Sequence, residues 1–203
     1  MRHTFTPKKF DHLIGMEGFT VQLLKNHFKL YEGYVENTNK LLETLAETPT
    51  DGKDPNYAEL SRRLGFELNG MRLHEYYFEN LGGDGDFDLA PTLAKELKSS
   101  YGDFDTWKEI FVATGAIRGV GWCILYRDPI TGGLISQWIG EHEVGHPAGW
   151  TPVLVMDLWE HAYMLDYGTE RKGYIEAFFA NVNWAAVETR VKEASRQLAG
   201  TRK

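Results

Sequence analysis

The segment from Asp157 to Tyr163 places a carboxylate and an imidazole four residues apart, between aromatic side chains. The preceding run, Thr151 to Met156, is apolar and rich in β-branched residues, which predicts a buried strand. Asp157 would end that strand and His161 would lie in the turn that opens the next helix, so both could converge on one point. A buried carboxylate without a cationic partner is costly, so a metal ion is a natural explanation. The alternative is an ordinary helix start, with Asp157 as its N-cap.

The sequence from Asp157 to Trp184 resembles the C-terminal pattern of the iron/manganese superoxide dismutase family. In that family Asp-x-Trp-Glu-His-Ala-Tyr is followed by Asp-Tyr, an arginine, a tyrosine before leucine or isoleucine, and a closing Asn-Trp. The corresponding residues here are Asp157 to Tyr163, Asp166-Tyr167, Arg171, Tyr174-Ile175 and Asn183-Trp184. The resemblance implies that Asp157 and His161 are two of the ligands of a metal ion.

Composition favours a compact soluble enzyme. The chain has 203 residues, enough for one large domain or two small ones with a sizeable core. A net charge of −7 argues against broad nucleic-acid binding, although a local basic funnel for a small anion is compatible with it. The single cysteine, Cys123, excludes an intramolecular disulfide or a thiolate cluster. We expect no membrane span, no signal peptide in Met1 to Phe10, and a cytoplasmic protein.

The predicted fold class is α+β, divided at the glycine-rich turn of residues 82–85. The N-terminal domain (residues 1–84) should be an antiparallel hairpin of helices over Phe19 to Leu45 and Tyr57 to Leu81. The C-terminal domain (residues 85–203) should hold a three-stranded antiparallel sheet surrounded by helices. Its strands are predicted at residues 121–126, 133–139 and 151–156, and its helices at 90–99, 104–116, 158–165, 173–180 and 184–198. The family that the sequence resembles has the same architecture.

Two ligands cannot hold a redox metal, so the hairpin must supply others. His27 lies on the apolar face of the first predicted helix, and His74 lies on the second. Taken singly, each histidine is more often a core or surface residue than a ligand. One inward-facing histidine on each helix, beside the Asp157–His161 pair, favours the ligand interpretation. The resemblance implies the same set, because the family takes one histidine from each hairpin helix.

The first hairpin helix departs from the family's spacing. The family's first ligand usually lies eight positions before the tyrosine of a Tyr-Val pair, whereas His27 lies seven before Tyr34. The family's register would place Asn26 at the ligand position. We favour His27 because asparagine is a poor ligand for such a site, and a local change of helical winding could absorb the missing residue.

The family also needs a polar residue that touches the metal-bound solvent. Many members place a glutamine four residues before the second ligand, where this chain has Gly70. A subgroup has a histidine ahead of the aspartate, and His142, fifteen residues before Asp157, resembles it. His146 is the rival, but the glycine and proline beside it indicate a turn. Both histidines could instead be ordinary surface residues of a loop.

Three aromatic residues are predicted to surround the metal. The resemblance implies that Tyr34 is the gate and proton donor near the open face, and that Trp122 and Trp159 form a wall that excludes bulk water. From spacing alone, all three could simply belong to the core.

The resemblance implies a homodimer or a homotetramer, with Glu160 hydrogen-bonded to His161 of the partner subunit. A solvated carboxylate at a helix start is the alternative for Glu160. In the family one histidine and one tyrosine also bond across the dimer, and here Tyr31 and Met164 replace them. Because a thioether is a weak acceptor, we expect an apolar contact between these two.

Three imidazoles and one carboxylate suit Fe, Mn or Zn. Zinc cannot change valence, so dismutation of superoxide to O2 and hydrogen peroxide requires one Fe or Mn ion per chain. The sequence does not distinguish iron from manganese. Two alternatives stay open: a mononuclear zinc hydrolase, which the same ligands would serve, and a catalytically silent relative that keeps the fold for binding.

Overall fold

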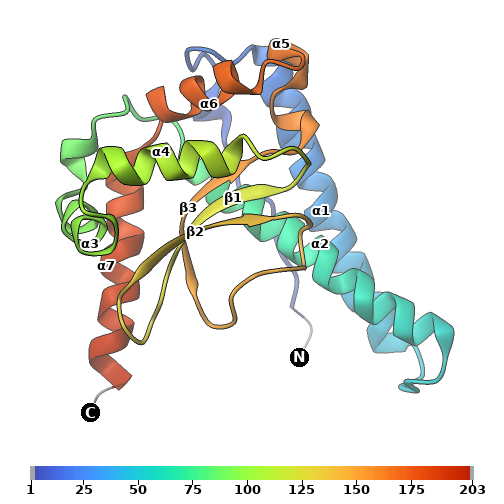
Figure 1. Ribbon diagram of the computed structural model, residues 1–203. Coiled ribbons are helices and arrows are strands. Elements are labelled where there is room, and N and C mark those ends of the chain that lie inside the picture. The colour runs from blue at the N-terminus through green and yellow to red at the C-terminus, as the bar shows by residue number, and fades with distance from the viewer. Residues whose placement is uncertain (1–2, 202–203) are drawn as a thin grey trace.

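The computed structural model describes the backbone of residues 3–201 and the side chains of residues 3–196. Two long helices, α1 (Val21–Glu47) and α2 (Pro55–Glu79), lie side by side and are joined by a short loop (Figure 1). Each begins at a capping side chain, because Thr20 and Asp54 accept hydrogen bonds from backbone N–H groups of the first turns. The short connection makes the two helices antiparallel, as the predicted hairpin requires.

The second half is built around a three-stranded antiparallel sheet. The strand β1 (Trp122–Arg127) lies between β2 (Leu134–Ile139) and β3 (Thr151–Asp157). Every residue of β1 is buried, which fits its central position. The register pairs Trp122 with Asp157, the last residue of β3. The end of β3 is therefore held against the start of the central strand.

Helices surround this sheet and confirm the predicted α+β class. They are α3 (Pro91–Tyr101), α4 (Phe104–Gly115), α6 (Arg171–Ala180) and α7 (Trp184–Thr201), with the short 3-10 turn η2 (Phe87–Leu89). A further 3-10 turn, η1 (Asp11–Leu13), precedes α1 in the N-terminal half. In Figure 1, α4 crosses over the sheet, and α7 runs beside it and contacts β3. Within residues 3–201, none of the helices combines the length and the apolar character that a membrane span requires.

The helix predicted over residues 158–165 is wrong. The chain instead forms a single 3-10 turn, η3 (Glu160–Ala162), and then one short α-helical turn, α5 (Met164–Tyr167). Between them Tyr163 has φ −145°, which is outside the helical region, and Gly168 ends the second turn with φ +54°. These breaks leave the segment as a compact corner directly after β3.

Buried side chains form one connected cluster that joins the two halves of the molecule. The helix α2 packs on β3, where the Asn80 amide donates to the Val155 carbonyl at 2.6 Å. The Asn80 carbonyl in turn accepts a hydrogen bond from the Asn183 N–H at 2.6 Å. The hairpin is thereby fixed against the sheet, and a domain boundary at residue 84 stays a prediction.

Candidate metal centre

Four side chains from four separate elements meet between the hairpin and the sheet. His27 comes from α1, His74 from α2, Asp157 from the end of β3 and His161 from η3. The Nε2 atoms of His161, His27 and His74 lie 3.1, 3.2 and 3.5 Å from the same oxygen, Asp157 Oδ2. One possible ligand atom from each residue lies within 4.8 Å of all the others. The four residues predicted as ligands are therefore brought together.

The position of Asp157 follows from the strand that it ends. Its Oδ1 accepts a hydrogen bond from the Trp159 N–H at 2.8 Å, which turns the chain and leaves Oδ2 facing the histidines. The Tyr174 hydroxyl donates to the Asp157 carbonyl at 2.6 Å, and the Tyr77 hydroxyl lies 3.2 Å from that of Tyr174. The sequence pattern contains Tyr174 but did not predict this supporting role, which depends on α6 crossing the strand end.

His74 is oriented by a backbone acceptor. Its Nδ1–H donates to the Gly70 carbonyl, one helical turn earlier, at 2.6 Å. Since a carbonyl oxygen can only accept, the neutral ring carries its proton on Nδ1 and turns the Nε2 lone pair toward the cluster. The Nε2 atoms of His74 and His161 lie 3.3 Å apart. A metal ion placed between them would use both nitrogens, so the residues present fit such a group.

His27 is buried as deeply but is held differently. Its ring lies between aromatic neighbours, with centroids 4.8 Å from Phe78 and 5.2 Å from Tyr77. Its Nδ1 is buried and has no hydrogen-bond partner among the described residues. Packing orients His27, whereas a hydrogen bond orients His74.

Charge at the cluster is also suited to a cation. Burial lowers the pKa of His27 to about 4 and that of His74 well below its usual range, so both are neutral at pH 7. Burial would raise the pKa of the Asp157 carboxyl, but the charge of His161 and hydrogen bonds from His161 and His27 together hold it well below its usual range. The result is a fully buried carboxylate among imidazoles. A metal cation bound by these groups would neutralise the negative charge of the carboxylate.

The helical register places His27, and not Asn26, in the cluster. Asn26 is exposed, and its side chain accepts a hydrogen bond from Gln22 on the surface of α1. The expected local change of winding is wrong, because α1, which is described throughout, is continuous α-helix from Val21 to Glu47. Seven residues span almost two turns of 3.6, so His27 and Tyr34 share one face without any distortion.

Tyr34, His142 and Trp122 form a hydrogen-bonded chain beside the cluster. The Trp122 Nε1–H donates to His142 Nδ1 at 3.0 Å, and His142 Nε2 lies 2.7 Å from the Tyr34 hydroxyl oxygen. Burial lowers the pKa of His142 to about 4, so the ring is neutral and carries its single proton on Nε2. His142 therefore donates to Tyr34, and the Tyr34 O–H is left to point elsewhere.

Aromatic side chains enclose this chain. The Trp122 ring centroid lies 5.1 Å from that of His74, and the Trp159 ring lies 4.9 Å from His142. Phe66 lies 4.5 Å from His142 and closes a further side; the sequence pattern did not single it out. The absence of a side chain in Gly70 also matters, because a Cβ there would stand 2.6 Å from a carbon of the Tyr34 ring. Glycine at this position makes room for Tyr34.

Comparison with known proteins agrees with this geometry. Residues 89–190 match the family model described as iron/manganese superoxide dismutases, C-terminal domain. Superoxide dismutase (Fe) of Cupriavidus metallidurans is 35% identical over 89% of this chain and 92% of its own length. The chain belongs to the iron/manganese superoxide dismutase family. Superoxide dismutase (Fe) of Aquifex aeolicus is 34% identical over 96% of this chain and 94% of its own. Superoxide dismutase (Mn) 2 of Haloferax volcanii is 31% identical over 83% and 84%.

The residues predicted for a dimer interface are split between surface and interior. Glu160 is exposed, and Met164 is 46% exposed beside Leu165, which is 58% exposed. Tyr31, by contrast, is buried, and its hydroxyl donates to Glu75 at 3.0 Å within the same chain. In this member of the family the hydroxyl of Tyr31 is therefore already engaged, and its place in an interface stays a prediction.

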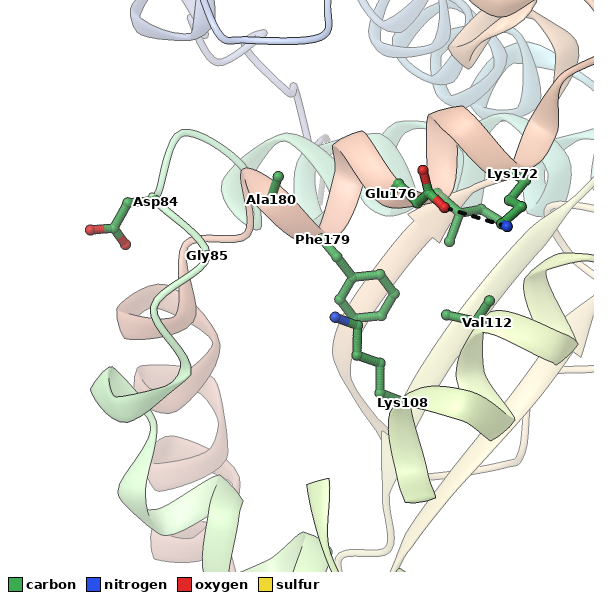
Figure 2. A pocket seen from close by; sticks show the side chains of 9 residues that line it. Asp84, Gly85, Lys108, Val112, Lys172, Glu176, Phe179 and Ala180 are labelled. Carbon is green, nitrogen blue, oxygen red and sulfur yellow. Dashed lines mark ion pairs between the residues drawn. The ribbon is translucent and has the colours of Figure 1, made fainter. Parts of the chain in front are cut away.

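A separate pocket lies between α4 and α6, away from the four candidate ligands. Figure 2 shows Lys108 of α4 extending over Phe179 of α6, with its amino nitrogen 4.8 Å from the ring centroid. Lys172 and Glu176 form an ion pair at the rim, with 3.8 Å between the charged atoms. None of the residues that line this pocket belongs to the metal cluster or to the Tyr34 chain.

Proposed function

We propose that this protein is a superoxide dismutase that converts superoxide to O2 and hydrogen peroxide at one Fe or Mn ion. The ion would be held by His27, His74, Asp157 and His161. The observation that carries the proposal is the convergence of three imidazole nitrogens on a single buried carboxylate oxygen. Membership of the iron/manganese superoxide dismutase family supports it. When bound, Fe or Mn supplies the change of valence that the dismutation of superoxide requires.

Tyr34 and His142 would manage protons beside the ion. Burial holds the pKa of the Tyr34 hydroxyl above its usual range, so this phenol keeps its proton at neutral pH. Because the oxygen of Tyr34 accepts from His142 Nε2, its own O–H is free to donate to a reduced oxygen species as that species leaves. Trp122 and Trp159 would exclude bulk water from the same space.

A zinc hydrolase is the less favoured candidate. Its ligand set would be the same, but zinc cannot change valence. The relatives described above carry the name superoxide dismutase, with either iron or manganese. Both iron and manganese occur among those names, and three imidazoles with one carboxylate suit either metal.

We also propose that the protein is a homodimer or a dimer of dimers, with Glu160 bonded to His161 of the partner subunit. His161 is 22% exposed at its side chain, and its Nδ1 makes no hydrogen bond within the described chain. A nearby carboxylate from a second copy would supply the acceptor that a metal-bound histidine normally has. A cytoplasmic location stays a prediction.

Metal analysis combined with a superoxide assay tests the proposal. The purified protein should contain close to one Fe or Mn per chain and should turn over superoxide. Replacement of any of the four ligands by alanine should remove most of the metal and the activity, because each leaves an incomplete ligand set.

The exposed His12→Ala variant serves as the control and should behave as wild type. Zinc without superoxide turnover would favour the hydrolase, and no metal would favour a silent relative. Full Fe or Mn occupancy in His27→Ala would refute the ligand register.

A further inference from the structure

The connection between β2 and β3 carries His142 and has no regular secondary structure around it (Figure 1). His142 is fully buried, yet Glu141 and Glu143 on either side are exposed, and Val144 is 59% exposed. The aromatic rings around His142 pack against its side chain, but the exposed residues on either side give the main chain of this loop little packing of its own. The position of the His142 main chain therefore depends on specific hydrogen bonds.

The side chain of His146, four residues farther along, contacts the main chain of His142. Its Nε2 lies 2.7 Å from the His142 carbonyl oxygen, and its Nδ1 lies 2.5 Å from the Tyr126 hydroxyl. A carbonyl can only accept, so His146 donates from Nε2. A neutral ring then has a lone pair on Nδ1, which accepts the Tyr126 O–H. Each of these groups has its hydrogen-bonding role fixed by its neighbour.

Both contacts lead back to one strand. Trp122 and Tyr126 are four residues apart in β1, and the strand period of two places them on the same face. Trp122 holds the ring of His142 directly, while Tyr126 holds its carbonyl through His146. The same strand also pairs with Asp157. Strand β1 thus positions both the candidate ligand Asp157 and His142, the hydrogen-bond partner of Tyr34.

We propose that His146 is a positioning residue, which clamps the main chain of His142 to Tyr126 and so sets the contact between His142 and Tyr34. The proposal rests on the proposed function and deepens it. It differs from the expectation that His146 is only a turn residue. The loop keeps a second tie without His146, because the Gln137 side chain donates to the Gly145 carbonyl at 2.8 Å. Loss of His146 should therefore alter the gate more than the fold.

Three metal-loaded variants test this proposal: His146→Ala, His146→Gln and Tyr126→Phe. The measurements are metal content, kcat for superoxide, and the dissociation constant of azide from the visible spectrum of the metal centre. His146→Ala should keep its metal, lose about 10-fold in kcat and change the azide constant, because His142 is no longer held. His146→Gln should recover most of both, because its side-chain N–H can still donate to the His142 carbonyl. Tyr126→Phe should fall between alanine and wild type.

The exposed Val144→Ala change in the same loop is the matched control and should leave all three measurements unaltered. Wild-type kcat and azide affinity in His146→Ala would overturn the proposal, as would a glutamine variant as impaired as alanine. If His146→Ala does not fold, Tyr126→Phe decides by the same criteria. Azide titration needs no turnover, so it tests the role of His146 even if wild type fails to dismute superoxide, a result that would refute the proposed function alone.

Discussion

His142 and His161, two histidines of the site, differ in how many of their ring nitrogens are hydrogen-bonded within one chain. On the side of the gate, both ring nitrogens of His142 are bonded, one to Trp122 and one to Tyr34, and the ring is fully buried. At His161, by contrast, the side chain is 22% exposed, and its Nδ1 makes no bond within the described residues. The exposed Glu160 lies next to it in sequence.

This difference separates what one chain can do from what it needs a second chain for. The hydrogen-bonded chain of the gate residue Tyr34 with His142 and Trp122 comes from α1, the loop after β2, and β1 of a single chain. It should therefore form in an isolated subunit. His161, a proposed ligand, has no acceptor at its Nδ1 among the described residues, although a metal-bound imidazole usually has one. The Nδ1 of His27 also has none, but His27 is fully buried, so only His161 can be reached by a second chain. Metal affinity should therefore depend on assembly, whereas the properties of the gate should not.

Glu160→Ala should have the largest effect, which we expect on both dimer stability and metal content. Removing one member of a buried charge-assisted bond costs about 2–5 kcal/mol. We expect the variant to dissociate at lower dilution than wild type and to lose metal at the same time. Sedimentation velocity with metal analysis of each fraction measures both. Glu43→Ala, an exposed carboxylate on α1, is the control; a Glu160→Ala protein that stays dimeric and fully loaded would refute our account of His161.

His142→Ala should lower turnover and leave metal content and assembly unaltered. It removes the donor to Tyr34 without touching a ligand, so the variant should keep its metal and its oligomeric state. Turnover should fall by about 10- to 100-fold, and the reduction potential should shift, because an outer partner of the site is lost. Redox titration and pulse-radiolysis kinetics would measure these changes. Loss of metal from this variant would mean that the gate and the ligands are not separable.

Acid should destabilise the metal-free protein partly because the buried His142 resists protonation in the folded state. The folded-state pKa of His142 is lowered to about 4 by burial, whereas an unfolded histidine titrates near 6.5. Between these values the unfolded chain binds a proton that the folded chain does not, so stability falls as pH falls. Urea unfolding from pH 6.5 to 4.5 should show a slope shallower in His142→Ala than in wild type, by at most about 1.4 kcal/mol per pH unit. An equal slope would contradict this, and His12→Ala should match wild type.

Met164→Leu should have the smallest effect. Met164 is 46% exposed, and leucine keeps most of its apolar surface. If the contact at this position is apolar, dimer dissociation and metal content should match wild type in the same sedimentation experiment. A clear loss of dimer would show that the methionine makes a more specific contact than we infer.

The sequence was sufficient for those features that depend on local pattern. An apolar run that ends in Asp157 predicted β3 and its terminal carboxylate, and helical periodicity predicted α1 and α2. The prediction of a helix over residues 158–165 was wrong because the periodicity of apolar residues does not reveal a break in the backbone such as the one at Tyr163. The expected change of winding in α1 was unnecessary, since a spacing of seven already keeps two residues on one face.

Other features of the site depend on contacts between residues far apart in the chain. Nothing near Tyr31 in the sequence indicates that its hydroxyl would bond to Glu75 on the neighbouring helix. The role of His146 likewise requires the path of a loop that brings it to Tyr126. The glycine and proline beside His146 predicted a turn, and the structure has one just after His146, where the Pro147 carbonyl accepts a hydrogen bond from the Trp150 N–H at 3.2 Å. They gave no information about what the His146 ring would bind.

Diffraction from a crystal of the metal-loaded protein, recorded on both sides of the Fe and Mn absorption edges, tests the central claim most directly. Our account predicts one anomalous peak per chain, bounded by the Nε2 atoms of His27, His74 and His161 and by the carboxylate of Asp157. A peak at any other position, or one that responds only at the zinc edge, would contradict it.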